Sequence, residues 1–90
     1  LAAGTSEHIA FFTMGNLYDK KNELDKAIEY WEKAVEIEPN YAEAQYNLGV
    51  GYFKLKKLDK ARECWERVRL LRPDSETLLA AEEALKATEY

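Results

Sequence analysis

The chain has 90 residues, enough for one small domain with a thin hydrophobic core. Its composition is that of a globular protein and excludes a disordered chain, because 47% of the residues are hydrophobic and two are tryptophans. The net charge of −4 argues against nucleic acid as a partner, and no apolar run approaches the ~18 residues that membrane insertion requires.

Residues 1–7 are interpreted as a linker or a cloning remnant, because they lack a charged n-region and are too few for a signal peptide. A first helix is expected over about residues 8–20, where apolar residues recur at helical spacing. Asn22 suits the following turn, because its short side chain tolerates a left-handed backbone. A second helix should begin at Leu24 and end before Pro39, since proline disfavours a helical conformation at the preceding residue.

The same order of elements returns in residues 42–75, with Lys56 in the turn and Pro73 at the end. Lysine fits a left-handed turn position less well than asparagine does. After Pro73, either Asp74 or Ser75 can cap a fifth helix. The sequence therefore predicts five helices.

The two helix pairs form an internal repeat. Shifting the chain by 34 residues brings 12 of 34 positions into identity, far more than random pairing gives. A fixed period of this length is typical of a solenoid built from helix pairs. The identical pairs are Ala10 and Ala44, Gly15 and Gly49, Tyr18 and Tyr52, Lys20 and Lys54, Leu24 and Leu58, Asp25 and Asp59, Lys26 and Lys60, Ala27 and Ala61, Glu29 and Glu63, Trp31 and Trp65, Glu32 and Glu66, and Pro39 and Pro73.

Glycine, alanine and tryptophan recur at packing positions of both units. Glycine inside a helix costs about 1 kcal/mol relative to alanine, so its repetition suggests close approach of two helices. We expect each alanine to face the glycine of its own unit, and each tryptophan to fill the space between neighbouring units. These residues are Gly15, Ala27 and Trp31 in the first unit and Gly49, Ala61 and Trp65 in the second.

The pattern resembles the tetratricopeptide repeat family. The family signature places an aromatic residue, Leu-Gly, Tyr, Ala, a second aromatic and Pro at fixed offsets. The second unit departs from it at Gln45 and Val68, and residues 76–90 lack the Leu-Gly and Tyr positions. The matching residues are Phe11, Met14, Gly15, Tyr18, Ala27, Trp31, Ala34 and Pro39 in the first unit, and Leu48, Gly49, Tyr52, Ala61, Trp65 and Pro73 in the second.

This resemblance implies an all-α fold, a right-handed α-solenoid of antiparallel helix pairs. Residues 1–90 would form a single domain, with repeat 1 at 8–41, repeat 2 at 42–75 and a capping helix at 76–90. The resemblance also implies a protein–protein interaction module, in which the first helices line a concave groove. A short peptide segment or a helix of a partner protein would bind there.

One stripe on each first helix is not needed for packing inside the helix pair, and its spacing places it on one helix face. This stripe predicts a groove that contains two asparagines, whose side-chain amides offer a donor and an acceptor to the backbone of a bound peptide. Aromatic rings in the same groove would contact apolar side chains of the peptide. An alternative remains open, in which the aromatic rings simply complete a thin core. The candidate groove residues are Phe12, Asn16, Tyr46, Asn47, Val50, Phe53 and Lys54, and the matching positions of the capping helix are Thr77, Ala80, Ala81 and Ala84.

One subset of the family grips the C-terminal carboxylate of heat-shock chaperones. Asn16 and Asn47 match the two asparagines of that subset. Phe12, Thr77 and Ala81 stand where the subset carries basic residues. Without those cations the charge-assisted hydrogen bonds to a carboxylate are lost, so chaperone-tail binding is not expected.

A structural role remains the main alternative function. The chain would then be a segment of a longer solenoid or of a self-associating assembly, because Phe11 and its neighbours are expected to be exposed at the first unit. Residues 42–75 carry a net charge of +3, which indicates either a patch for an acidic partner or an ordinary solvated face.

Catalysis is not expected. His8 is the only histidine, which excludes a histidine-based metal site or catalytic dyad within the chain. Gly49 and Gly51 resemble the start of a dinucleotide fingerprint, but no strand precedes them and no third glycine follows. No cofactor is therefore predicted. Cys64 is the only cysteine and cannot form an internal disulfide, which favours the cytoplasm.

Overall fold

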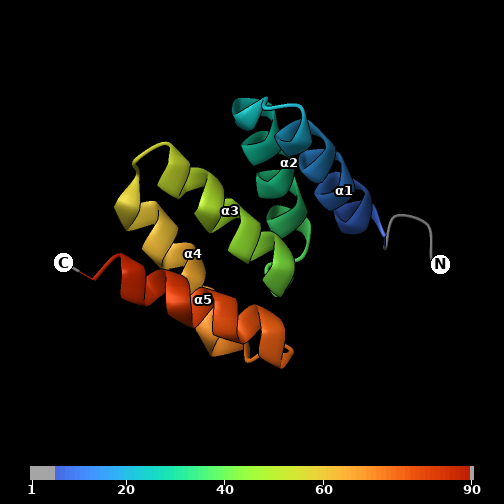
Figure 1. The fold of residues 1–90 in the computed structure, drawn as a ribbon. Coiled ribbons are helices and arrows are strands. Elements are labelled where there is room, and N and C mark those ends of the chain that lie inside the picture. The colour runs from blue at the N-terminus through green and yellow to red at the C-terminus, as the bar shows by residue number, and fades with distance from the viewer. Residues whose placement is uncertain (1–5, 90) are drawn as a thin grey trace.

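The structure, a computed structural model, describes residues 6–89 and consists there of five helices. They are α1 (Glu7–Lys20), α2 (Leu24–Ile37), α3 (Ala42–Lys54), α4 (Leu58–Leu71) and α5 (Ser75–Ala87). α1 with α2, and α3 with α4, form antiparallel pairs, and α5 packs on α4 (Figure 1). The predicted all-α repeat fold is confirmed, although α1 and α5 each begin one residue earlier than expected. Most of residues 1–7 lie outside the described part of the chain.

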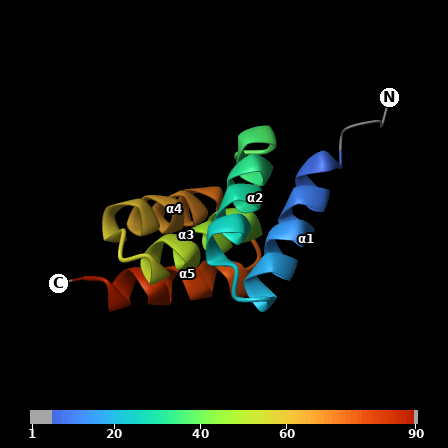
Figure 2. The same cartoon turned by 90° about the horizontal axis from the view of Figure 1, so that it is seen from above.

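The hydrophobic core is centred on α3, which packs against α2, α4 and α5. Seen from above, the α1–α2 pair crosses the group formed by the other three helices (Figure 2). Among residues 6–89, no helix combines the length and the apolar composition needed to span a membrane. The buried core residues include Ala27, Ile28, Trp31, Leu48, Tyr52, Ala61, Trp65, Val68, Ala81 and Leu85.

Each tryptophan lies directly against the glycine of its own unit. A Cβ atom at Gly15 would lie 2.5 Å from Nε1 of Trp31, and one at Gly49 would lie 2.5 Å from Nε1 of Trp65. The three atoms nearest to the Gly15 site all belong to the indole ring of Trp31, so the tryptophan and not Ala27 is the closest neighbour of this glycine. The flat ring needs the space that a missing side chain leaves, whereas two small residues facing each other would leave a void.

A third glycine brings the two units together. A Cβ atom at Gly51 would lie 2.8 Å from Cγ1 of Ile28 and 3.5 Å from Cζ3 of Trp31, both on α2. The sequence assigned no packing role to this residue. The two central glycines of α3 thus allow close packing against different units. Gly49 contacts Trp65 of its own unit, and Gly51 contacts Ile28 of the preceding unit.

The turn after α1 is the predicted one. Asn22 has a φ of 64°, and the N–H of Glu23 donates to the carbonyl of Tyr18 at 2.9 Å. This is the hydrogen-bond pattern of a Schellman motif. Lys56 repeats the turn after α3 with a φ of 65°, although a left-handed backbone costs about 1–2 kcal/mol for a residue with a Cβ atom.

The second helices end differently in the two units, although a proline follows both. Glu38, before Pro39, has a φ of −131°, as expected for the residue that precedes a proline. Arg72, before Pro73, instead has a φ of 50° and a ψ of 58°, a left-handed conformation that the sequence did not predict. This sharper turn fits a shorter connection, since three residues separate α4 from α5 and four separate α2 from α3.

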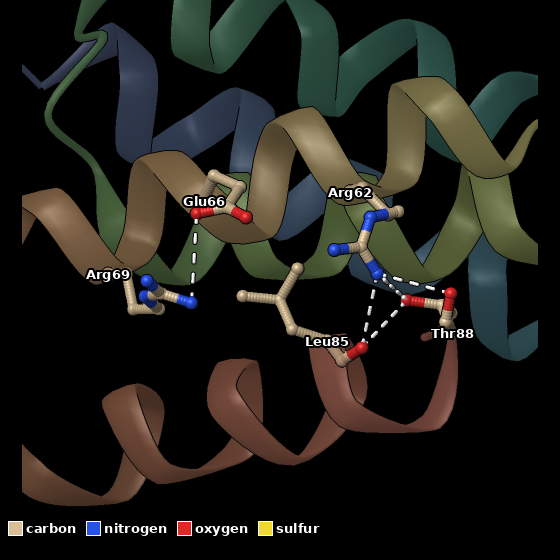
Figure 3. Close-up of polar contacts among 5 residues, drawn as sticks. All are labelled: Arg62, Glu66, Arg69, Leu85 and Thr88. Atoms are coloured by element: carbon tan, nitrogen blue, oxygen red, sulfur yellow. Dashed lines mark hydrogen bonds and ion pairs between the residues drawn. The ribbon is translucent and has the colours of Figure 1, made fainter. Parts of the chain in front are cut away.

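Both ends of α5 are held by side chains. Asp74 caps its N-terminus, because Oδ1 accepts a hydrogen bond of 2.9 Å from the N–H of Thr77, and this bond lowers the pKa of the Asp74 carboxyl. Arg62 of α4 holds the C-terminus (Figure 3). Its Nη1 donates to the carbonyls of Leu85 at 3.2 Å and Thr88 at 3.1 Å, where a cation also complements the helix dipole.

Candidate functional site

The candidate groove residues lie on α1 and α3, which are joined by a hydrogen bond between asparagines. Oδ1 of Asn16 accepts one bond from Nδ2 of Asn47 at 3.0 Å and another from Nε1 of Trp31 at 3.1 Å. The side-chain oxygen of Asn16 thus accepts two hydrogen bonds from within the protein, which occupies both of its lone pairs. Within residues 6–89, the Nδ2 of Asn16 and the Oδ1 of Asn47 have no hydrogen-bond partner, and these two atoms could meet a ligand backbone.

Three apolar candidates are half-buried and pack against the core. They are Phe12, Tyr46 and Val50. This packing agrees with the alternative in which these side chains complete a thin core. The ring of Phe12 lies 4.9 Å from that of Tyr41, and the ring of Tyr46 lies 6.5 Å from that of Trp65. Each of these side chains can offer a ligand only the part of its surface that stays exposed.

Phe53 and Lys54, at the end of α3, are the more accessible candidates. The side chain of Phe53 is 46% exposed, and its ring lies 6.1 Å from that of Trp65. Nζ of Lys54 lies 3.8 Å from Oδ1 of Asp19 on α1. Because both members of this ion pair are largely exposed, it contributes about 0–1 kcal/mol and leaves Lys54 able to exchange partners.

A hollow of about 330 Å³ lies between α3 and α5, next to the two candidates at the centre of α3. Its volume is at the lower end of the range for ligand sites, so it suits a single side chain better than a whole small molecule. Three carboxylates border it, which favours a cationic side chain. The lining residues are Glu43, Tyr46, Asn47, Asp74, Glu76, Thr77 and Ala80.

The capping helix contributes fewer groove positions than predicted. Thr77 and Ala80 border the hollow. Ala81 is fully buried and Ala84 packs against the core, so neither faces a ligand. The difference arises because α5 packs mainly against α4, and Ala81 lies inside the core that these helices share.

Tyr41 is a neighbour of this surface that sequence reasoning missed. Its ring contacts His8 at 5.3 Å and Phe12 at 4.9 Å, which joins the start of α1 to the start of α3. Burial raises the pKa of the Tyr41 hydroxyl, and the carboxylate of Glu43 adds to this effect. Because Tyr41 lies in the connection between α2 and α3, only its aromatic character could have drawn attention to it.

A larger hollow, of about 460 Å³, lies over α4 and away from the candidate groove. Gln45 and Cys64 contribute to its lining. Burial, together with the nearby carboxylates of Glu63 and Glu32, raises the pKa of the Cys64 thiol to about 12. The thiol is therefore protonated at neutral pH and is a poor nucleophile, which agrees with a structural cysteine.

Cys64 is expected to resist alkylation in the folded chain. At pH 8, iodoacetamide should react with it about a thousandfold more slowly than in urea, because the pKa rises from 9.0 to about 12 on folding. Only the unfolded thiol ionises between these two values, so the free energy of unfolding should also fall as pH rises from 9.0 towards 12. Equal alkylation rates with and without urea would contradict the burial of this thiol.

Comparison with known protein families identifies the repeat. The family model described as "TPR repeat" matches residues 15–56, and the model described as "Tetratricopeptide repeat" matches residues 42–75. Together with the five helices in this order, these matches decide the family. The chain belongs to the tetratricopeptide repeat family.

A stretch of 39 residues is 49% identical to protein O-mannosyl-transferase TMTC1 of Mus musculus. The match covers 43% of this tetratricopeptide repeat chain and 4% of the mouse protein. The chain thus corresponds to a very small part of that relative.

Tetratricopeptide repeats generally mediate interactions between proteins, and this is the broad function that the family assigns to the chain. The expectation that the chain does not bind chaperone tails stays a prediction. The basic positions of the chaperone-binding subset fall on Phe12, Thr77 and Ala81, and the last of these is fully buried.

Proposed function

We propose that the module binds a short segment or a helix of a partner protein along α1, α3 and α5. The observation that carries this proposal is the hollow between α3 and α5, because candidate residues predicted from the sequence border it from both helices. Its acidic rim and the exposed ring of Phe53 favour a segment that combines a Lys or Arg with an apolar side chain.

The asparagine pair supports the same proposal. The free Oδ1 of Asn47 and Nδ2 of Asn16 would give a ligand backbone one acceptor and one donor, while the bond between the two side chains holds them in place. We also propose that the module works in the cytoplasm without catalysis of its own. The single cysteine and its protonated thiol support this view.

Site-specific photo-crosslinking would test the groove. A photoreactive phenylalanine would replace Phe53, which is 46% exposed beside the groove, or Leu79, which is 56% exposed on α5 beside Arg69 and Glu82. Partners from a lysate of the source cells should crosslink from position 53 and not from position 79. Equal crosslinking from both positions would contradict groove binding.

A filling substitution makes the test sharper. Ala80→Leu should occupy the hollow and reduce crosslinking from position 53 about tenfold, while Ala87→Leu on the exposed side of α5 should not. These variants are better than truncations of Tyr46 and Asn47, because both of those side chains also make packing contacts or hydrogen bonds. Circular dichroism would confirm that both leucine variants keep the helical content of the wild type.

A further inference from the structure

The hollow over α4 lies where the second repeat unit lacks two aromatic rings that the first unit has. In the first unit, Phe11 stacks on Tyr30 with 6.0 Å between the ring centres. The equivalent residues of the second unit are Gln45 and Cys64, and both line the hollow of about 460 Å³. The hollow thus marks the place of a ring pair that the second unit does not supply.

A cation remains at this place although the rings are missing. In the first unit, Nζ of Lys33 lies 5.6 Å from the centre of the Phe11 ring and 5.2 Å from that of the Tyr30 ring. The equivalent residue of the second unit is Arg67, which is exposed and borders the hollow. Arg67 forms no ion pair within residues 6–89. Because a guanidinium attracts the face of an aromatic ring, Arg67 can cover a ring that enters the hollow from outside.

Gln45 offers a hydrogen-bond acceptor at the same place. The residue is only 8% exposed, and its Nε2 donates to the carbonyl of Pro39 at 3.0 Å, which fixes the side-chain amide. Within the described part of the chain, Oε1 of Gln45 accepts no hydrogen bond. Every fully enclosed side-chain oxygen or nitrogen of residues 6–89 has a partner, so this unpaired oxygen is accessible, and the hollow is the space that it borders. An unpaired acceptor favours a ring that carries a donor over a plain benzene ring.

The edge of the hollow combines an apolar side chain with acidic ones. Leu70 is 78% exposed and extends the lining to the surface, where it can pack against a residue beside a bound ring. Glu63 and Glu66 border the same hollow. Two carboxylates against the single cation of Arg67 disfavour an anionic ligand, such as a phosphorylated side chain.

Among aromatic side chains, tyrosine fits these features best. Phenylalanine has no donor for Oε1 of Gln45, and the double ring of tryptophan is larger than the single rings that fill this place in the first unit. A second copy of the chain is a poor source of the ring. All tyrosines within residues 6–89 are buried or half-buried, so this part of a second copy has no exposed tyrosine to insert.

We propose that the hollow over α4 binds the unphosphorylated tyrosine side chain of a partner protein. The ring takes the place of the missing aromatic pair and lies under Arg67, and its hydroxyl donates to Oε1 of Gln45. An apolar residue beside the tyrosine packs on Leu70. This hollow shares no lining residue with the one between α3 and α5, so the proposal is independent of binding in the groove.

Titration with N-acetyl-tyrosinamide would test the proposal, because this compound carries the side chain on a capped backbone. In nitrogen–proton correlation spectra, it should shift the side-chain resonances of Gln45 and Arg67 with a dissociation constant of about 1 mM. N-acetyl-phenylalaninamide should bind several-fold more weakly, because it leaves the acceptor unpaired. N-acetyl-O-phosphotyrosinamide should cause no shift at the same concentrations.

Two variants and a matched control separate the hollow from nonspecific binding. Cys64→Tyr should abolish binding, because it returns the ring of the first unit to this place. A new ring on α4 can also disturb folding, so Arg67→Gln is the second variant. Arg67 is exposed, and its loss should leave the helical content unchanged and weaken binding about threefold to fivefold. Lys33→Gln removes the equivalent cation of the first unit and should leave binding unchanged.

The residue beside the tyrosine gives a further measurement. N-acetyl-tyrosyl-leucinamide should bind several-fold more tightly than N-acetyl-tyrosinamide, and Leu70→Asn should remove the difference. The proposal fails if Arg67→Gln binds as well as the wild type, or if the resonances of Tyr46 and Asn47 shift in place of those at the hollow. It also fails if p-cresol binds and N-acetyl-tyrosinamide does not, because the hollow would then accept a free phenol and not a side chain of a partner.

Discussion

Gly49→Ala is expected to lower the free energy of unfolding by about 2–3 kcal/mol, even though alanine is the better helix former. The added methyl would lie 2.5 Å from Nε1 and 2.8 Å from Cδ1 of Trp65. The ring is 3% exposed, and its N–H donates to the carbonyl of Tyr46, so it cannot turn aside without losing packing and a hydrogen bond. Overpacking of this kind costs about 1–3 kcal/mol or more, and it exceeds the gain in helix propensity of about 1 kcal/mol.

Urea unfolding followed by circular dichroism would measure this loss. A domain of this size has about 3–5 kcal/mol of stability in total, so the variant should be partly unfolded without denaturant. Thr13→Ala is the control, because Thr13 is an exposed residue inside α1 where alanine meets no clash. That control should be neutral or slightly stabilising. If Gly49→Ala were as stable as the control, the close contact with Trp65 would be wrong.

Trp31→Ala is expected to cost about 3–5 kcal/mol and to leave little folded protein. Trp31 is 2% exposed and occupies the junction of the two units, because its ring faces Gly15 on α1 and approaches Gly51 on α3. Its removal also deprives Asn16 of a hydrogen bond of 3.1 Å. The loss should therefore reach both units rather than the first unit alone.

Trp31→Phe is the matched variant for this prediction. It keeps an aromatic ring but has no N–H to donate, so it should lose about half as much stability as the alanine variant. Denaturant midpoints and the loss of amide protection in α3 would be measured for both. A Trp31→Ala protein with unchanged protection in α3 would show that the ring does not join the units.

The repeat made the fold predictable. Two prolines and a turn asparagine bounded the helices, and the spacing of Gly15 and Trp31 indicated close packing in both units. The 34-residue period could not show which side chain of α2 packs against Gly15. The sequence places Ala27 and Trp31 on the same apolar side of α2, and only their shapes decide that the indole meets Gly15.

The candidate site was less predictable, because helical spacing describes a face and not its contacts. Asn16 and Asn47 are on the expected helices, but their mutual hydrogen bond depends on how two units sit against each other. Ala81 shows the same limitation, since a small residue on an outer repeat position can either line a groove or be buried completely. Its burial follows from the packing of α5 on α4, which the internal period does not specify.

The two tryptophans make nearly identical steric contacts but donate to different acceptors. Trp31 donates to a side-chain amide at the junction of the units, and Trp65 donates to the main-chain carbonyl of Tyr46 at 3.3 Å. A chain that incorporates fluorinated tryptophan should therefore give two separate fluorine resonances, one for each repeat. The protein thus carries its own pair of spectroscopic labels, with which the melting of each repeat can be followed without any substitution.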